Sequence, residues 1–259
     1  MQNELTLALI QANLVWENPT ENRIRLQKHI ESISDPIDII ILPEMFTTGF
    51  TMHPKGLAET MDGATVTWMK HMSEKTNSAI VGSTIIEENS MFYNRLLFIH
   101  PNGDVDTYDK KHTFTLAGEH EVYESGHANS LIQYKGWQIK TLICYDLRFP
   151  VWARNVEDYD ILLYVANWPS VRISAWDALL QARAIENMSY TIGVNRVGLD
   201  GNDHEYPGHS GVYNVLGHRL DNIPAQEEAI GIVTLSSSHI TKYRNKLGFL
   251  KDRDSFSLK

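Results

Sequence analysis

Cys144 is the only cysteine in this 259-residue sequence and the residue best suited to nucleophilic chemistry. It follows the apolar pair Leu142 and Ile143 and precedes Pro150, where a short helix could begin. Backbone N–H groups at such a junction between strand and helix stabilise a thiolate and an oxyanion. A lone cysteine beside an apolar run is, however, more often an inert core residue. Cys144 is therefore a candidate nucleophile whose role depends on its surroundings.

Two charged residues also stand where apolar segments end. Glu44 follows the run 39–42 and Pro43. An acid at such a position is either a solvated loop residue or a desolvated base with a raised pKa. Lys110 follows the strand-like segment 104–108 and precedes Lys111, so it belongs either to a charged turn or to a functional site. Neither residue identifies a reaction by itself.

Motifs for common cofactors are absent from the sequence. No two of the sixteen glycines are spaced two apart, so there is no G-x-G-x-x-G, and no phosphate-binding G-x-x-x-x-G-K-[ST] occurs. The eleven histidines include no H-E-x-x-H, and His204 and His209 are separated by a Pro-Gly pair that prevents a helix. We therefore expect neither a metal nor an organic cofactor.

The elements that must position these residues alternate between strands and helices. Strands are predicted where short apolar or alternating runs occur, and helices where apolar residues recur at spacings of three and four. The predicted strands are 5–10, 37–42, 79–86, 91–100, 104–108, 137–144, 161–166, 190–197, 211–216 and 230–235. The predicted helices are one that begins at Asn18 with Leu26, Ile30 and Ile33 on one face, one that contains Val66, Met69 and Met72, and one over 175–188. Continuous apolar strands between helices favour an α/β fold in which helices cover buried sheets.

Composition limits the partners. Apolar residues make up 42% of the chain, and 23 basic against 32 acidic residues give a net charge of −9. This balance lacks the basic field that binds nucleic acid or anionic membranes. The lone cysteine fits a reducing compartment, and no export signal or apolar run of membrane-spanning length is present, so we expect a cytoplasmic protein. We predict one domain over 1–259, with a core of about 5–241 and a tail of about 242–259.

Three segments, taken in order, resemble the signatures of the nitrilase superfamily of carbon–nitrogen hydrolases. They are 42–46 (LPEMF), 108–112 (YDKKH) and 143–150 (ICYDLRFP). The resemblance extends from Leu5 to about Thr241. Segments 167–169 (NWP), 176–177 (WD), 182–187 (ARAIEN) and 193–198 (GVNRVG) resemble the ω-amidase branch of that superfamily.

The resemblance implies a four-layer α-β-β-α sandwich and a catalytic triad of Glu44, Lys110 and Cys144. It also implies an auxiliary acid after the lysine, for which Glu119 is the better match and Glu121 the alternative. The expected mechanism is attack by the cysteine on an amide, a thioester intermediate and its hydrolysis, with an oxyanion held by the lysine and by the backbone N–H that follows the cysteine. No cofactor is required.

The ω-amidase resemblance further implies a small carboxamide substrate, 2-oxoglutaramate or 2-oxosuccinamate. Its carboxylate requires a cation. The arginines available for that role are Arg148, Arg172, Arg183 and Arg196, and the residues expected to complete the pocket are Tyr145, Phe46 and Trp168.

Three alternatives stay open from the sequence. The same triad could act on a nitrile, an N-carbamoyl compound or an aliphatic amide. The chain could also be a non-catalytic module that binds small carbonyl compounds or another protein. The resemblance implies a homodimer formed by the helices after the cysteine strand and by the C-terminal tail, although that tail could equally be frayed.

Overall fold

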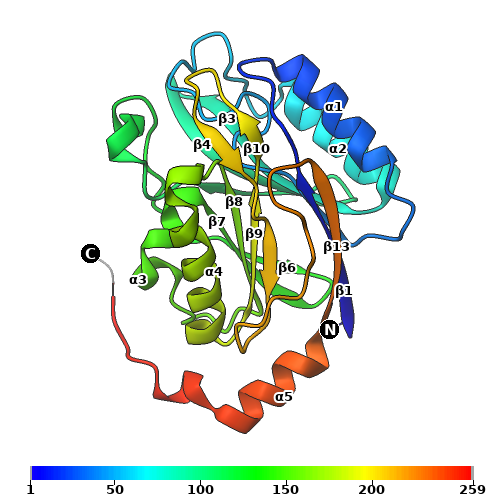
Figure 1. Cartoon of the computed structure of the whole chain (residues 1–259), viewed down its shortest axis with the longest axis vertical. Coiled ribbons are helices and arrows are strands. Elements are labelled where there is room, and N and C mark those ends of the chain that lie inside the picture. The colour runs from blue at the N-terminus through cyan, green and yellow to red at the C-terminus, as the bar shows by residue number, and fades with distance from the viewer. Residues whose placement is uncertain (1, 258–259) are drawn as a thin grey trace.

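The computed structural model describes residues 2–257 as two β-sheets that lie face to face between helices (Figure 1). The larger sheet has the strand order β13-β1-β2-β3-β4-β5, the second β12-β9-β8-β7-β6, and β10 pairs with β11. The strands are β1 Glu4–Gln11, β2 Ile39–Ile41, β3 Ala79–Glu88, β4 Met91–Ile99, β5 Val105–Asp109, β6 Leu131–Tyr134, β7 Trp137–Ile143, β8 Ile161–Ala166, β9 Tyr190–Asn195, β10 Val197–Leu199, β11 Glu205–Pro207, β12 Gly211–Tyr213 and β13 Ala229–Ser236. The helices are α1 Pro19–Glu31, α2 Ala64–Thr76, α3 Pro150–Ala153, α4 Ile173–Asn187 and α5 Ser237–Leu247.

The larger sheet is buried on both faces because its strands carry apolar residues on both. In β1, Leu7 and Leu9 point into the core shared with the second sheet, whereas Ala8 and Ile10 pack in a separate cluster beneath α1 and α2. Leu26 of α1 belongs to that outer cluster. Because successive side chains of a strand point to opposite faces, the larger sheet packs on the second sheet with one face and on α1 and α2 with the other.

The second sheet has a parallel centre covered by α4. Strand β7 pairs with β8 in the register Ile143↔Val165, and β8 pairs with β9 in the register Val165↔Val194. Helix α4 lies so close to β9 that a Cβ on Gly193 would come within 2.5 Å of Leu180. The order helix, sheet, sheet, helix confirms the predicted four-layer α/β sandwich.

The predicted elements mostly agree with the structure, and the differences have local causes. Helix α1 begins where predicted, since the Asn18 side chain accepts a hydrogen bond from the Glu21 N–H and proline stands at the first helical position. The helix ends at Glu31, however, so Ile33 does not belong to it. Strands β6, β10 and β11 were not predicted, because each is only three or four residues long and none lies in a continuous apolar run. Strands β2 and β12 are shorter than the predicted 37–42 and 211–216, with three residues each.

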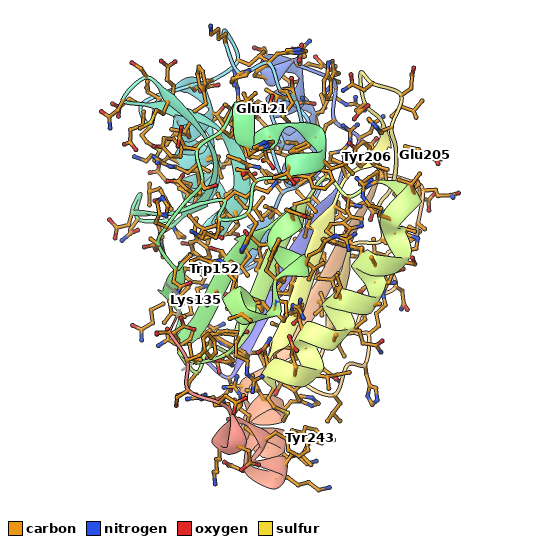
Figure 2. The ribbon with its side chains drawn as sticks, turned by 90° about the vertical axis from the view of Figure 1, so that its left-hand side faces the viewer. Glu121, Lys135, Trp152, Glu205, Tyr206 and Tyr243 are labelled. Atoms are coloured by element: carbon orange, nitrogen blue, oxygen red, sulfur yellow. The ribbon has the colours of Figure 1, made fainter. Side chains whose placement is uncertain are left out.

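The C-terminal segment is anchored on the same chain. Helix α5 runs across the predicted boundary at 241–242. Arg244 pairs with Asp160 at 3.0 Å and Arg253 with Asp158 at 2.6 Å. In Figure 2, Tyr243 of α5 lies at the opposite end of the molecule from Tyr206. Residues 1 and 258–259, the outer ends of the predicted domain and tail, lie outside the described residues, and no helix in the described part is long and apolar enough to cross a membrane.

Candidate active site

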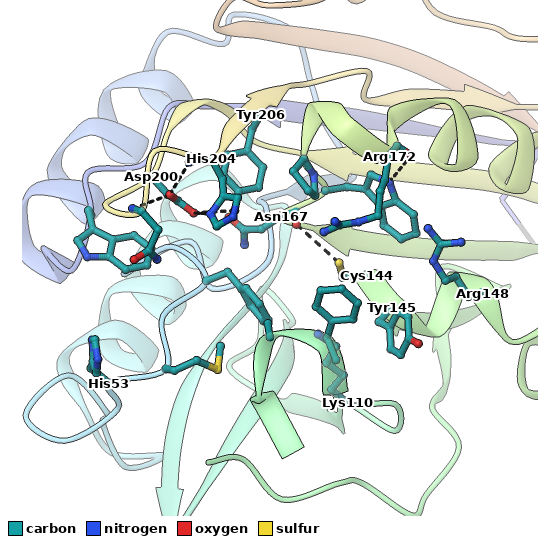
Figure 3. A pocket seen from close by; sticks show the side chains of 18 residues that line it. His53, Lys110, Cys144, Tyr145, Arg148, Asn167, Arg172, Asp200, His204 and Tyr206 are labelled. Atoms are coloured by element: carbon teal, nitrogen blue, oxygen red, sulfur yellow. Dashed lines mark hydrogen bonds and ion pairs between the residues drawn. The ribbon is translucent and has the colours of Figure 1, made fainter. Parts of the chain in front are cut away.

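A pocket of about 360 Å³ opens where strands of both sheets end (Figure 3). Cys144 directly follows β7, Lys110 directly follows β5, and Asn167 directly follows β8. All three line the pocket. Because the parallel strands β7 and β8 end at the same edge of their sheet, residues far apart in the sequence meet there. The other lining residues are Trp16, Phe50, Met52, His53, Phe114, Ala117, Tyr145, Arg148, Trp168, Pro169, Arg172, Asp200, Asn202, His204 and Tyr206.

The Lys110 ammonium lies between two carboxylates. Its Nζ is 2.9 Å from Oε1 of Glu44 and 3.0 and 2.9 Å from the two oxygens of Glu119. All three side chains are fully buried, at 1% exposure or less. Glu121, the alternative auxiliary acid, has a side chain that is 75% exposed. The structure therefore places Glu119, and not Glu121, beside the lysine.

The Glu44 carboxylate is fixed by two asparagines that the sequence interpretation did not single out. Its Oε2 accepts a 2.7 Å hydrogen bond from the Asn167 backbone N–H, and its Oε1 accepts a 2.8 Å bond from the Asn94 side-chain amide. Asn94 lies 3.4 Å from Glu119 as well. It therefore holds the two carboxylates beside one another. A polar residue inside β4 carries no sequence signal for this role, whereas Asn167 follows an apolar strand as the triad candidates do.

Cys144 occupies a strained turn. Its φ angle is +42°, in the left-handed region that side chains with a Cβ rarely adopt. Such a conformation costs about 1–3 kcal/mol and persists only where its surroundings impose it. Met45, which follows Glu44, has a φ angle of +41° and is held by a 2.9 Å hydrogen bond from its N–H to the Ser83 hydroxyl. Both left-handed residues are therefore in or next to the predicted triad.

The electrostatics of the site distinguish the three groups. Burial raises the pKa of the Cys144 thiol well above its usual range, and the charge of Glu44 raises it further against the opposing effect of Lys110. Burial and the Glu44 charge thus both favour the neutral thiol over the thiolate. Burial opposes the charge on Lys110, but Glu119 and Glu44 outweigh it and raise the pKa of this ammonium. Lys110 is thus a permanent cation, unsuited to act as a base.

Three of the four predicted pocket residues line the cavity, and one does not. Tyr145, Arg148 and Trp168 do so. Phe46 is wrong as a pocket residue, since it is fully buried in the cluster beneath α1 and α2 and packs on Trp68 with ring centroids 5.9 Å apart. The left-handed turn at 45 redirects the chain, and Phe50 lines the pocket instead.

The four candidate arginines separate into two groups. Arg148 and Arg172 line the pocket, the first over the Trp168 ring and the second over the Phe114 ring, at 5.0 and 5.2 Å. Within residues 2–257, neither guanidinium is in an ion pair with a carboxylate. Arg183 and Arg196 have structural partners instead, since the former pairs with Glu186 at 2.8 Å and the latter donates to backbone carbonyls.

Metal binding has no candidate site in the part of the chain that the structure describes. No group of three or more histidine, cysteine, aspartate or glutamate side chains is arranged there to hold an ion. The Cys144 thiol and the Lys110 ammonium line the pocket, and the carboxylates of Glu44 and Glu119 contact that ammonium. Together these groups form a set suited to nucleophilic attack with proton transfer.

Comparison with known proteins gives consistent matches. The carbon–nitrogen hydrolase family matches residues 6–245. The chain is 42% identical over 254 residues to the omega-amidase YafV of Escherichia coli K12, which covers 98% of each protein. It is 32% identical over 220 residues to the 2-oxoglutaramate amidase of Bacillus subtilis 168, covering 83% of this chain and 85% of that protein.

Among solved structures, a CN-hydrolase superfamily protein from Xanthomonas campestris superposes with a TM-score of 0.97. It is 39% identical to this chain, and the match covers all of both chains. That crystal structure contains an arsenic adduct in its active site.

Proposed function

Because the chain belongs to the carbon–nitrogen hydrolase family, we propose that it is a cysteine-dependent ω-amidase that hydrolyses the terminal carboxamide of a small 2-oxo acid. Its substrates are 2-oxoglutaramate and 2-oxosuccinamate, and its products are the dicarboxylate and ammonia. Family membership confirms the resemblance inferred from the three sequence motifs. The observation that carries the proposal is a lysine ammonium held between two buried carboxylates in the pocket of the sole cysteine.

In the proposed mechanism, Glu44 is the base that takes the proton from the Cys144 thiol as sulfur attacks the amide carbon. A neutral resting thiol requires such a base, and the raised pKa of Cys144 supports this role over a preformed thiolate. The tetrahedral oxyanion is stabilised by the Lys110 ammonium and by the backbone N–H of Tyr145. Two donors on an oxyanion in a partly closed pocket lower the barrier to attack.

The intermediate then collapses as Glu44 returns the proton to the departing nitrogen. Breaking the C–N bond releases ammonia and leaves a thioester on Cys144. A water molecule, activated by Glu44, attacks the thioester carbonyl, and the thiol is regenerated as the acid leaves. Glu119 does not exchange protons in this scheme. It holds Lys110 in place through hydrogen bonds of 3.0 and 2.9 Å.

Recognition of the 2-oxo acid is assigned to the two free arginines of the pocket. A guanidinium matches a carboxylate in a bidentate geometry, and Arg148 and Arg172 lack a carboxylate partner of their own among the described residues. Both lie over aromatic rings that also line the pocket. The rings of Trp168 and Tyr145 complete the wall of the substrate site.

The substrate assignment is tested by ammonia release from a panel of amides. The panel contains 2-oxoglutaramate, 2-oxosuccinamate, a chain-length-matched aliphatic amide without the carboxylate, a nitrile and an N-carbamoyl amino acid. We expect kcat/KM for the two 2-oxo amides to exceed that for the neutral amide by at least about 10²-fold, which corresponds to a lost charge-assisted contact on each arginine. Equal rates on the neutral amide, or faster turnover of the nitrile or carbamoyl compound, would reject the ω-amidase assignment.

We also propose that the protein is a homodimer in the cytoplasm. Exposed apolar side chains lie on the segments that follow the cysteine strand and on α4, namely Val151 at 49%, Val156 at 42% and Ile185 at 48% exposure. These exposed residues lie on the segments where the family resemblance implies a subunit interface, which supports association there. The free thiol of Cys144 suits a reducing compartment. Light scattering after size exclusion tests the dimer, and a monomer at micromolar concentration would reject it.

A further inference from the structure

A buried carboxylate that the proposed mechanism does not use lies two residues after Cys144. Asp146 is fully buried and accepts four hydrogen bonds. Its Oδ2 accepts from the Tyr108 hydroxyl at 2.8 Å and from the Ile143 N–H at 3.0 Å. Its Oδ1 accepts from the backbone N–H and from Nδ1 of His112, at 3.0 and 2.7 Å. Asp146 does not line the Cys144 pocket, and the hydrogen bonds that it accepts all come from the protein itself.

The donors to Asp146 flank the two groups that must meet in catalysis. Tyr108 and His112 stand on either side of Lys110, two residues away in each direction. Ile143 directly precedes Cys144. One carboxylate therefore joins the segment that carries the ammonium to the segment that carries the thiol, although these segments come from different sheets.

The His112 ring is itself held in one orientation. It stacks on Phe149 with ring centroids 3.6 Å apart and an interplanar angle of 3°. Since the carboxylate accepts, the ring must carry its hydrogen on Nδ1 to bond to Asp146. The Phe149 N–H in turn donates to the Asp146 carbonyl at 3.0 Å. The ring, the carboxylate and the turn after the cysteine thus form one rigid unit.

From these contacts, we propose that Asp146 and His112 are a positioning pair that imposes the left-handed turn on Cys144 and sets its sulfur against the Lys110 ammonium. This inference deepens the proposed function, because it rests on the roles given there to Cys144 and Lys110. The turn at Cys144 needs such a constraint, since a φ angle of +42° is unfavourable for any residue with a Cβ. Both residues act through others and are not catalytic.

The test compares substitutions at His112 that keep or lose the hydrogen-bond donor. In His112→Asn, the side-chain amide can replace Nδ1, whereas in His112→Ala the donor is lost and in His112→Gln it is displaced. His127→Ala is the matched control, because His127 shares the outer surface with His112 and contacts Lys111 at 3.4 Å but not Asp146. For each variant we measure kcat and KM for 2-oxoglutaramate and the rate at which iodoacetamide alkylates Cys144 at pH 9.

For His112→Ala and His112→Gln, we expect kcat to fall by about 10²-fold with KM within about threefold, because a displacement of about 1 Å is enough for such a loss. If the Lys110 ammonium moves from about 4 to about 5 Å from the Cys144 sulfur, the weaker attraction raises the pKa of the thiol. The smaller thiolate fraction then slows alkylation by about fourfold. His112→Asn and His127→Ala should stay within about threefold of the wild type in both assays.

Two outcomes would overturn the positioning pair. One is that His112→Ala and His112→Gln resemble His127→Ala in kcat and alkylation. The other is that His112→Asn loses as much as His112→Ala, because the ring and not its donor would then matter. If the His112 variants do not fold, Asp146→Asn and Tyr108→Phe replace them with the same two readouts. If the wild-type protein does not hydrolyse 2-oxoglutaramate, the proposed substrate is rejected. The positioning pair is still tested in that case, because alkylation of Cys144 needs no substrate.

Discussion

The floor and the rim of the Cys144 pocket are built in opposite ways. At the floor, Lys110 and the two glutamates behind it, Glu44 and Glu119, are buried to 1% exposure or less, and the lysine is bonded to both carboxylates. At the rim, Arg148 is exposed and lies over an aromatic ring, and His53 has a side chain that is 79% exposed. The floor is thus over-determined, whereas the rim is held by few contacts. Substrate preference can therefore change at the rim without disturbing the catalytic groups beneath it.

The largest expected effect comes from removing the nucleophile at the floor. Cys144→Ala should lower kcat by at least about 10⁴-fold, as the loss of a catalytic nucleophile does in other hydrolases. Far-UV circular dichroism and the thermal midpoint should remain those of a folded protein. Substantial residual ammonia release from 2-oxoglutaramate by this variant would show that the thiol is not the nucleophile.

The second-largest effect is expected at Glu44, whose role as a base and whose negative charge have separate readouts. Glu44→Gln should lower kcat by about 10²- to 10⁴-fold, because the general base is lost. The same variant should be alkylated faster at pH 8. The Glu44 charge raises the pKa of Cys144, so its removal lowers that pKa and increases the thiolate fraction. The alkylation rate of Cys144 is measured by quenching samples at set times and determining the alkylated fraction by mass spectrometry. Slower alkylation than in the wild type would contradict the effect that we assign to the Glu44 charge.

A smaller and selective effect is expected at the rim. Arg148→Met and Arg172→Met should each raise KM for 2-oxoglutaramate by about 10- to 100-fold and leave kcat within about threefold, because a charge-assisted hydrogen bond to the substrate is lost. KM for a neutral aliphatic amide is the control and should not change. If both amides lose affinity equally, the arginines shape the pocket and do not bind a carboxylate.

The smallest effect should come from His53, an exposed residue at the rim of the pocket. His53 contacts Glu17 at 3.1 Å, yet its side chain is 79% exposed. His53→Ala should change kcat/KM by no more than about twofold, as is usual for exposed substitutions. Steady-state kinetics on 2-oxoglutaramate provide the measurement. A tenfold loss would place substrate contacts at this edge of the pocket and weaken the distinction between floor and rim.

The contrast also explains which parts of the site were predictable. Glu44, Lys110 and Cys144 were predicted because three ordered segments around them resemble the signatures of one family. Each residue follows a strand-like segment, but none of the three local patterns identifies the site by itself. Asn94 was missed because a polar residue within a strand looks the same whether it faces solvent or a carboxylate. Phe46 was misplaced because the left-handed turn at position 45 reverses the side on which the chain continues.

How well each helix or strand could be predicted depends on its length. The long strands and helices were predicted close to their bounds, since apolar periodicity over six or more residues reflects burial. Strands β10 and β11 have three residues each and pair with one another across a short connection, so they are too short to show a periodic signature. The boundary placed at 241–242 falls inside α5, because that amphipathic helix is too polar to stand out from a solvated tail.

The left-handed turn at Cys144 implies a conflict between activity and folding stability at this one position. Glycine adopts a φ angle of +42° with no steric penalty, whereas cysteine forgoes about 1–3 kcal/mol of the free energy of unfolding. Selection for the reaction therefore maintains a local cost to stability at this position. Replacement by glycine would relieve that strain, but it would also remove the packing of the thiol against the core and add conformational freedom to the unfolded chain, so stability data by themselves do not measure the fitness of this residue.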